Sequence, residues 1–170
     1  MAWGRKGKDS KAAEKARKAS VNDVEARAMM LLAMRDHGTE ELRKKLLDKY
    51  FPKEHVETVI ERFKSYNYLD DERVAERYVE YLARQCWGPS QIRMKMIKRA
   101  YTSKQIDIAM DEAIEDDSIW VEYARDRLRS KFRKEPDTLD QEERQKAWRH
   151  LAYRGYQGNI ISASMDKQDD

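Results

Sequence analysis

The sequence predicts an elongated, all-α protein in which three three-helix units follow one another as a tandem array, a curved helical solenoid. Ala, Leu, Met, Glu, Lys and Arg dominate the 170 residues, with only six Gly and three Pro, and this composition favours helix. The alternating β-branched residues that are typical of strands are missing. An apolar pattern within residues 36–60 returns fifty positions later, within residues 85–110. Such a repeat indicates units that bury their apolar faces on their neighbours.

The turn between two helices repeats together with the apolar positions. His37-Gly38-Thr39 stands where Trp87-Gly88-Pro89 stands fifty residues later. Apolar residues with the same offset are predicted to fill equivalent core positions. The pairs are Leu42/Ile92, Leu46/Met96, Leu47/Ile97, Phe51/Tyr101, Val56/Ile106, Ile60/Met110, Val24/Val74, Ala28/Tyr78, Leu31/Tyr81 and Leu32/Leu82.

Two charged segments lie outside the repeats. Residues 1–20 form a basic arm, in which seven Lys and Arg side chains outnumber Asp9 and Glu14, giving a net charge of +5. An arm of small and charged residues cannot bury enough apolar surface to fold alone, so we expect it to be flexible. It serves either as a solubilising tail or as a segment that attracts phosphates. Residues 166–170 form a short acidic tail.

The first unit is predicted to span residues 21–69. Ser20, or one of the polar residues shortly after it, caps a first helix that ends near Arg35. Gly38 breaks the chain, Thr39 caps the second helix, and Pro52 suits the first turn of the third. The predicted inner faces are Val24, Ala28, Leu31 and Leu32; then Leu42, Leu46 and Tyr50; then Val56, Val59, Ile60 and Phe63.

The second and third units are predicted to span residues 70–115 and 116–165. Asp70-Asp71 opens the second unit and Asp116-Asp117 opens the third, which predicts helix capping rather than a metal or acid–base site. A nine-residue insertion within 133–142, around Pro136, lengthens the internal loop of the third unit. The predicted inner faces of the two opening helices are Val74, Tyr78, Tyr81 and Leu82, and Trp120, Ala124 and Leu128.

Several classes of protein are disfavoured. The single cysteine, Cys86, cannot form an intramolecular disulfide and fits a reducing compartment. His37, His55 and His150 are too far apart for ligand spacing, and no glycine-rich phosphate loop occurs. We therefore expect no enzyme, no catalytic residue, no metal and no cofactor. The sequence has neither a secretion signal nor an apolar run approaching the ~20 residues that cross a bilayer, so we expect a cytoplasmic protein with no membrane contact. We also expect a monomer, since no pattern resembles a dimer seam.

Two basic stripes are candidates for partner binding. The first contains Lys95, Lys98 and Arg99, opposite the apolar face of their helix. The second follows the opening helix of the third unit and is our preferred location; it contains Arg125, Arg127, Arg129, Lys131 and Arg133. Either stripe could be a solvated outer face, since cations near a helix carboxyl end are favoured by its dipole. The functional interpretation is contact with nucleic-acid phosphates or acidic groups of a partner.

Arg93 lies among apolar positions on the inner side of its helix. A partly buried Arg needs a carboxylate, and we expect Asp70, Asp71 or Glu72 to supply it.

Three aromatic and glycine-containing positions are predicted to be structural. Trp87, before Gly88-Pro89, is interpreted as a packing anchor, with stacking on a base as the alternative. Trp148 is interpreted as structural as well. Arg154-Gly155-Tyr156 is expected to fix the last helix–helix turn, with Gly155 supplying backbone freedom.

Short stretches with a characteristic order and spacing run from Val24 to Ile161. They are Leu31-Leu32-Ala33-Met34-Arg35-Asp36-His37, Glu41-Leu42-Arg43-Lys44-Lys45-Leu46, Tyr68-Leu69-Asp70-Asp71-Glu72-Arg73, Trp87-Gly88-Pro89 with Ile92-Arg93, and Leu151-Ala152-Tyr153-Arg154-Gly155-Tyr156. Together they resemble the RecX family, the regulators of the RecA recombinase.

This resemblance implies a tandem three-helix-repeat fold and a cytoplasmic protein that binds RecA filaments on single-stranded DNA. It also implies that the protein limits filament growth, ATP hydrolysis, strand exchange and the cleavage of repressors that filaments promote in the SOS response. Direct binding to bare nucleic acid is then expected to be weak. The alternative is a general single- or double-stranded DNA-binding helical module without a recombinase target, based on the basic arm and the stripes.

Overall fold

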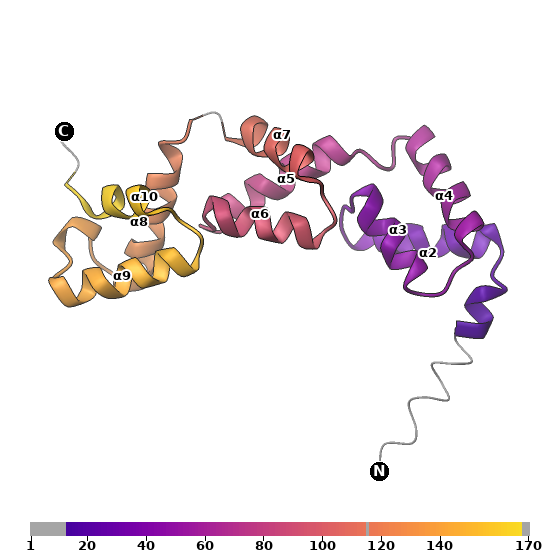
Figure 1. Cartoon of the computed structure of the whole chain (residues 1–170), viewed down its shortest axis with the longest axis horizontal. Helices are drawn as coiled ribbons and strands as arrows, with labels where there is room; N and C mark the ends of the chain where they lie inside the picture. Colours follow the sequence, from indigo (N-terminus) through magenta and orange to yellow (C-terminus); the bar gives the residue numbers. More distant parts are fainter. Residues whose placement is uncertain (1–12, 115, 168–170) are drawn as a thin grey trace, which may run out of the picture. The chain divides into compact units, whose positions relative to one another are not determined.

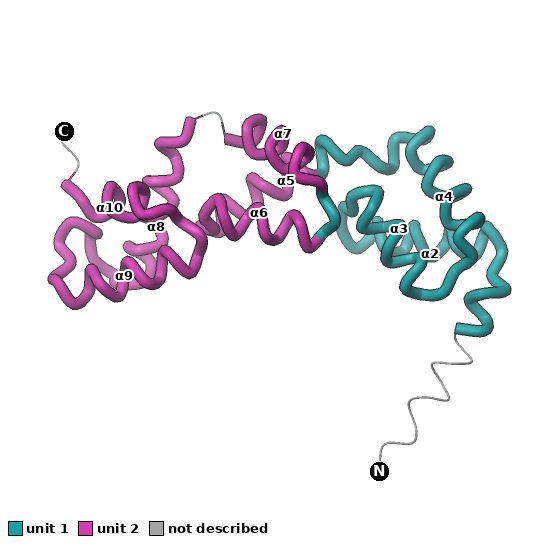
Figure 2. Tube along the Cα trace, in the orientation of Figure 1, with its two compact units in different colours: residues 1–74, 99–101 teal, residues 75–98, 102–170 magenta. Residues whose placement is uncertain are grey.

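A computed structural model describes residues 13–114 and 116–167, and all regular secondary structure within these ranges is helical (Figure 1). The chain divides into two compact units (Figure 2). Unit 1 comprises Met1–Val74 and Arg99–Tyr101, and unit 2 comprises Ala75–Lys98 and Thr102–Asp170. The all-α prediction is thereby confirmed.

Unit 1 is built on three helices: α2 (Val21–Met34), α3 (Thr39–Leu47) and α4 (Lys53–Ser65). The Ser20 side chain accepts a hydrogen bond from the Asp23 amide, and Asp23 bonds back to the Ser20 amide, so a capping box starts α2. Both α2 and α3 pack on α4. The core positions predicted for α3 and α4 are fully buried except Tyr50, which lies beyond the end of α3 and is 53% exposed. The buried cluster is Val24, Ala28, Leu42, Leu46, Val56, Val59, Ile60, Phe63 and Leu69.

The predicted flexible arm lies outside the described residues up to position 12, and it ends earlier than the sequence suggests. Residues 13–17 are helical, and Ala19 is buried. His55 Nδ1 lies 2.9 Å from the Ala19 carbonyl oxygen, to which it donates. The Arg17 guanidinium lies 5.7 Å from the Tyr50 ring centroid. These contacts attach residues 13–20 to unit 1, so the prediction of a free arm is wrong for this segment.

The Asp70-Asp71 pair caps two different helices. Asp70 Oδ1 accepts from the Arg73 amide at 3.0 Å, at the start of α5 (Asp71–Arg84). Asp71 Oδ1 accepts from the Thr39 amide at 2.6 Å, at the start of α3. The capping interpretation is confirmed for Asp70, and the second cap, across 32 residues of sequence, was not predicted.

Unit 2 contains most of α5 and the helices α6 (Pro89–Lys98), α7 (Ser103–Ala113), α8 (Ile119–Phe132), α9 (Gln141–Tyr153) and α10 (Gly158–Met165). Helix α10 packs on both α8 and α9. The predicted long loop contains a short 3-10 helix, η1 (Pro136–Thr138), with Pro136 and Leu139 buried. Buried core side chains of unit 2 include Val79, Leu82, Ile92, Met96, Ile106, Trp120, Ala124, Leu128, Ala147, Leu151 and Ile161.

The predicted inner face of α5 is correct for Val74 and Leu82, which are buried, and wrong for Tyr78 and Tyr81. Tyr81 is 58% exposed and Tyr78 is only partly buried, whereas Ala75, Val79 and Ala83 are buried. The spacing of four residues places these three side chains on one helical face, where small residues allow close approach. The offset of fifty therefore does not hold residue by residue along this helix.

The repeat is visible in the backbone conformation. Tyr50, Ala100 and Gly155 follow α3, α6 and α9, and their φ angles are 64°, 66° and 90°. An aromatic residue follows each of them: Phe51, Tyr101 and Tyr156. This recurrence supports three copies of one helical unit, although the limits predicted for them, at 21–69, 70–115 and 116–165, stay a prediction.

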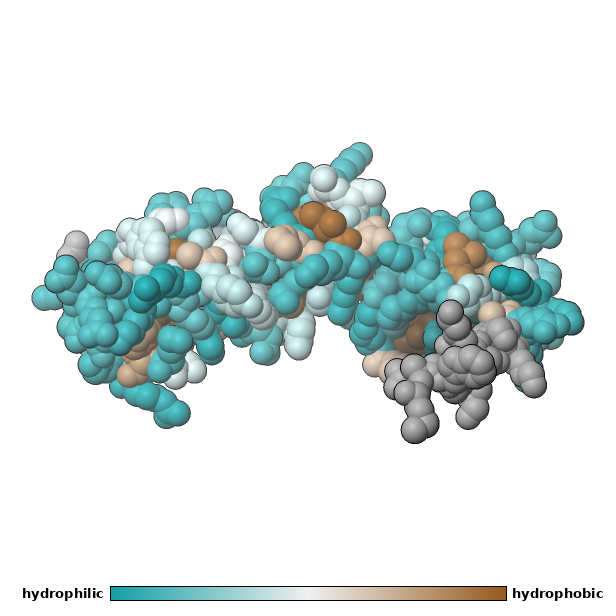
Figure 3. All heavy atoms as spheres, turned by 60° about the horizontal axis from the view of Figure 1, so that its bottom comes forward, coloured by the Kyte–Doolittle hydropathy of each residue, from teal (hydrophilic) through white to brown (hydrophobic). Residues whose placement is uncertain are grey.

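The face of the molecule drawn in Figure 3 is mostly polar. On the face drawn in Figure 3, hydrophobic residues form small patches within a hydrophilic surface. Among the described residues, no helix is both long enough and apolar enough to span a membrane.

Candidate functional site

Two glycines bring α6 and α9 into close contact within unit 2. The Gly88 amide donates to the Arg154 carbonyl oxygen at 2.9 Å, and the Ser90 amide donates to the Gly155 carbonyl oxygen at 3.2 Å. Two carbonyl groups just after α9 thus satisfy the amide before α6 and an amide in its first turn, which have no partner within α6. A Cβ atom on Gly88 would lie 2.5 Å from backbone atoms of Gly155 and Tyr156. This contact places the residues flanking both glycines beside each other.

Trp87 and Arg154 are the side chains that this junction brings together. The Arg154 guanidinium carbon lies 4.1 Å from the Trp87 ring centroid, and Lys95 Nζ lies 3.9 Å from the same centroid. Arg154 Nε donates to the Cys86 carbonyl oxygen at 2.8 Å, and its Nη2 donates to that of Gln85. Trp87 therefore holds two cations over its ring, and its role as a packing anchor stays a prediction.

Arg127 and His150 extend this positive region. Arg127 Nε donates to His150 Nε2 at 3.0 Å, across 23 residues of sequence. Burial and the nearby charges of Lys131, Arg127 and Arg154 lower the pKa of His150 to about 4, so this imidazole is neutral at pH 7. Burial and the charge of Arg127 also lower the pKa of Arg154. We call Lys95, Arg127, Lys131 and Arg154 the cationic cluster.

The charges of the cationic cluster are not compensated by ion pairs in the part of the chain that the structure describes. Among the described residues, none of its four members forms an ion pair with a carboxylate. Asp126 is a carboxylate close to this region, because it raises the pKa of Cys86, although burial raises that pKa more. It pairs instead with Arg129, at 3.1 Å. The cluster is therefore an unneutralised positive surface suited to an anion.

The depressed pKa of His150 predicts a pH-dependent stability. An unfolded His150 takes up a proton near pH 6.5, whereas the folded group resists protonation down to about pH 4. Because the unfolded state binds more protons in this window, stability falls as the pH falls from 6.5 to 4. At this half-buried position the loss is on the order of 1 kcal/mol after solvent screening.

Denaturant unfolding at pH 7 and pH 4.5 measures this loss. The control is His150→Gln, whose side-chain oxygen can still accept from Arg127 but does not titrate. Other groups titrate in both proteins, so the difference between them isolates His150. An equal loss of stability in both proteins would contradict the assignment.

The other predicted stripe residues lie in different environments. Lys98 and Arg133 are exposed, and Arg133 ends α8 with a φ of 59°. Arg99 is half-buried at the end of α6. Arg129 forms ion pairs with Asp126 and with Glu135, which neutralise it. The structure therefore brings together one member of the first stripe, Lys95, and two members of the second, Arg127 and Lys131.

Two predictions about arginines are wrong. Arg125 is only 3% exposed, so it is not on a partner-binding surface; it donates to the Ser164 and Asp166 carbonyl oxygens at the end of α10. Arg93 is exposed and pairs with Asp107 on α7, not with the carboxylates at the start of α5. In both cases the partner lies on or at the end of a neighbouring helix. A helical wheel describes one helix only, so it does not show how a neighbouring helix packs against it.

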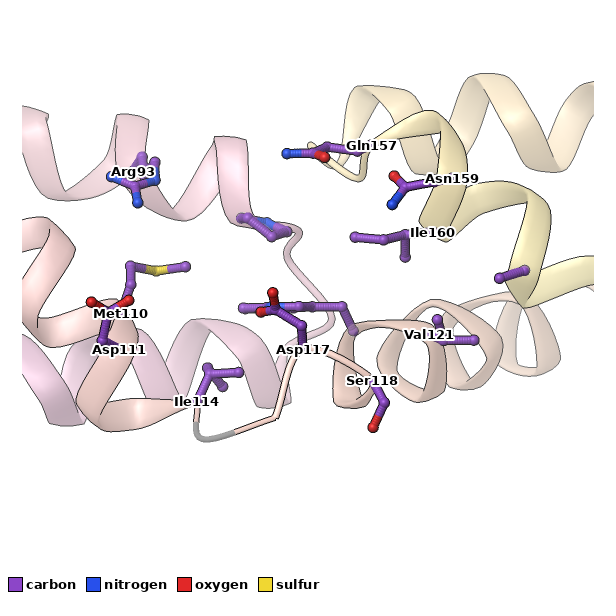
Figure 4. A pocket seen from close by; sticks show the side chains of 13 residues that line it. Arg93, Met110, Asp111, Ile114, Asp117, Ser118, Val121, Gln157, Asn159 and Ile160 are labelled. Carbon is purple, nitrogen blue, oxygen red and sulfur yellow. The ribbon is translucent and has the colours of Figure 1, made fainter.

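A separate cleft of about 630 Å³ lies between α6, α7, α8 and α10 of unit 2 (Figure 4). Arg93, Asp111 and Asp117 line it together with Met110 and Ile160. Within the described residues, no group of His, Cys, Asp and Glu side chains could hold a metal ion. The mixture of both charges in this cleft makes it less suited to an anion than the cationic cluster.

Sequence reasoning missed His150 and gave Arg154 a structural role only. Both belong to the positive region because α9 packs near α8 and α6. The sequence carries no local signal for this, since the contacts of Arg154 with Gln85 and Cys86 span 69 and 68 residues.

Fold and site together define a tandem helical-repeat protein with an unneutralised cationic surface. Residues 26–63 match the family model for the first three-helix domain of RecX, and residues 118–165 match that for the third. A regulatory protein RecX of Pseudomonas fluorescens Pf-5 is 37% identical over 139 residues, covering 82% of this chain and 87% of that protein. The RecX of Vibrio campbellii is 36% identical, covering 84% and 90%. The chain belongs to the RecX family.

Solved structures agree with this fold. A crystal structure of regulatory protein RecX aligns with a TM-score of 0.71 at 20% identity, covering 86% of this chain and 73% of that chain. RecX from Lactobacillus salivarius aligns with a TM-score of 0.69 at 17% identity, covering 85% and 94%. At these identities the likeness concerns the fold, and it confirms the helical repeat array.

Proposed function

We propose that this protein binds the RecA recombinase filament on single-stranded DNA. There it mainly inhibits ATP hydrolysis, strand exchange and the co-protease activity of the filament. The observation that carries the proposal is family membership over most of the chain, with relatives whose name is regulatory protein RecX. The expected cytoplasmic location and monomeric state belong to this proposal.

The proposed mechanism is a shift between filament states. A ligand changes an equilibrium only when it binds one state more tightly than the other. We expect the concave or basic side of the helical array to contact adjacent recombinase subunits and nearby DNA phosphates. Tighter binding to a state that does not extend would then favour disassembly over growth.

ATP turnover by the recombinase on single-stranded DNA tests this function. Adding this protein in substoichiometric amounts is expected to lower the turnover rate, because one bound molecule affects many subunits of a filament. Co-sedimentation with the coated strand measures association in the same samples. Unchanged turnover together with no association would refute the proposal.

A second candidate is a general nucleic-acid-binding module. The cationic cluster favours it, because unneutralised cations bind phosphates whatever protein surrounds the DNA. This function predicts tight binding to bare strands, whereas the first predicts tighter binding to the recombinase-coated strand. Titration of both substrates across salt concentrations separates the two.

A further inference from the structure

We infer that the cationic cluster, with His150 and Trp87, is a binding site for backbone phosphates of single-stranded nucleic acid. This inference deepens the proposed function, because it assigns the DNA contact to one surface of unit 2. Its members come from three helices: Lys95 from α6, Arg127 and Lys131 from α8, and His150 from α9, with Arg154 directly after α9.

The role of Trp87 in this site is to hold positive charge in place. Contacts of Lys95 and Arg154 with the ring, at 3.9 and 4.1 Å, position both cations without neutralising them. A carboxylate at the same place would position them equally well but would cancel the charge. The backbone bonds of Arg154 to Cys86 and Gln85 fix its guanidinium further.

Both arginines keep donors for a phosphate. Arg127 uses Nε for His150, and its two terminal nitrogens make no hydrogen bond among the described residues. The Nη1 atom of Arg154 likewise makes no hydrogen bond among the described residues. A planar guanidinium with two unused terminal nitrogens fits the bidentate geometry of a phosphate.

His150 couples this site to protons. The groups that act on its charge are Lys131 and Arg127 of α8 and Arg154 at the end of α9, all of them positive. A phosphate bound among these cations would offset their repulsion. The charged form of His150 then becomes less unfavourable, so binding is accompanied by proton uptake between about pH 4 and pH 6.5.

Several other cations of the molecule already form ion pairs within the described residues. In unit 2, Arg129, Lys134 and Lys146 pair with carboxylates on their own or the next element. In unit 1, Arg35, Arg43 and Arg62 pair with Glu41, Glu57 and Glu25. Phosphate binding at those positions would have to break an ion pair first, whereas the cationic cluster needs no such step.

The first experiment measures binding of a fluorescent oligothymidylate across salt concentrations, with no recombinase present. The test variant combines Lys95→Gln, Arg127→Gln and Lys131→Gln. Each lost phosphate contact lowers the slope of log affinity against log salt by about 0.7, so the slope is expected to fall by about 2. Affinity at low salt is expected to fall more than tenfold.

A matched control removes the same charge elsewhere in unit 2. It combines Lys104→Gln, Arg133→Gln and Lys146→Gln, three exposed side chains outside the cluster. Its slope is expected to stay within about 0.5 of the parent value, because general attraction changes but no specific contact is lost. Circular dichroism confirms that both variants stay helical. Equal slopes in the two variants would overturn the inference.

The second experiment follows His150 by NMR. Its imidazole resonance is titrated with pH in the free protein and at saturating oligothymidylate. The midpoint is expected to rise on binding, a change that a purely structural His150 would not show. An unchanged midpoint at saturation would overturn the inference.

These readouts separate the inference from the proposed function. Loss of oligonucleotide binding in the cluster variant supports the inference whether or not recombinase turnover responds. If the variant keeps oligonucleotide binding but loses affinity for recombinase without DNA, the cluster is a protein contact and the inference is wrong.

Discussion

A Gly155→Ala variant is expected to destabilise unit 2 by about 2–5 kcal/mol. Two effects combine at this position. The φ angle of Gly155 is +90°, a conformation that costs a residue with a Cβ roughly 1–2 kcal/mol. The added Cβ would also lie 2.5 Å from the Gln91 backbone nitrogen, and overpacking of this kind costs about 1–3 kcal/mol or more. Denaturant unfolding followed by circular dichroism measures the loss.

Ala100→Gly is the matched control, since Ala100 occupies the equivalent position after α6 with a φ of 66°. Relief of its strained backbone and the added flexibility of the unfolded glycine roughly cancel, so we expect a change within about 1 kcal/mol. Gly88→Ala tests the steric part alone, because its backbone carries no such strain. A stable Gly155→Ala protein would show that the contact between α6 and α9 is loose.

Arg125→Ala is expected to cost about 2–4 kcal/mol and to detach α10 from α8. Arg125 donates to the Asp166 carbonyl oxygen at 2.9 Å and, more weakly, to that of Ser164 at 3.4 Å. Arg144 Nη2 donates to the Met165 carbonyl oxygen at 2.7 Å. These oxygens end α10 and have no partner in their own helix, and hydrogen bonds from a charged group contribute roughly 1.5–3 kcal/mol each. Melting temperature and amide exchange of α10 measure the effect.

Arg133→Ala on the same helix is the control for this variant. Arg133 is exposed and forms no ion pair among the described residues, so its loss should change stability by less than about 0.5 kcal/mol. Equal effects of the two substitutions would contradict the capping role of Arg125. Charge reversal at Arg125 would therefore report on folding, and the residues that report on binding are Lys95, Arg127 and Lys131.

The apolar period was sufficient to predict the repeat architecture. Leu42, Ile92, Leu46 and Met96 are all fully buried, as their offset of fifty indicates. Burial of apolar area dominates the stability of a small helical unit, and the positions that supply it recur in every copy. The prediction failed for Tyr78 and Tyr81 on α5, because Ala75, Val79 and Ala83 form an apolar stripe that is buried together with Leu82 instead.

Only part of the candidate site could be predicted from the sequence. Lys95, Arg127 and Lys131 could be recognised as members of two basic stripes, whereas nothing local distinguished Arg127 and Lys131 from Arg125 or Arg129. Arg125 is buried because α10 ends against it, and Arg129 is neutralised because the loop carrying Glu135 returns to it. Both outcomes depend on which way a neighbouring element approaches the helix.

The sequence by itself determined the helical class, the repeated unit and the family, because these depend on local propensity, on periodic burial and on short ordered motifs. Only the tertiary structure decided which cations remain unneutralised and that Trp87, His150 and Arg154 join them. Charge–charge and cation–ring contacts act over a few ångströms between residues far apart in the chain. They are therefore set by how α6, α8 and α9 pack, which no single helix encodes.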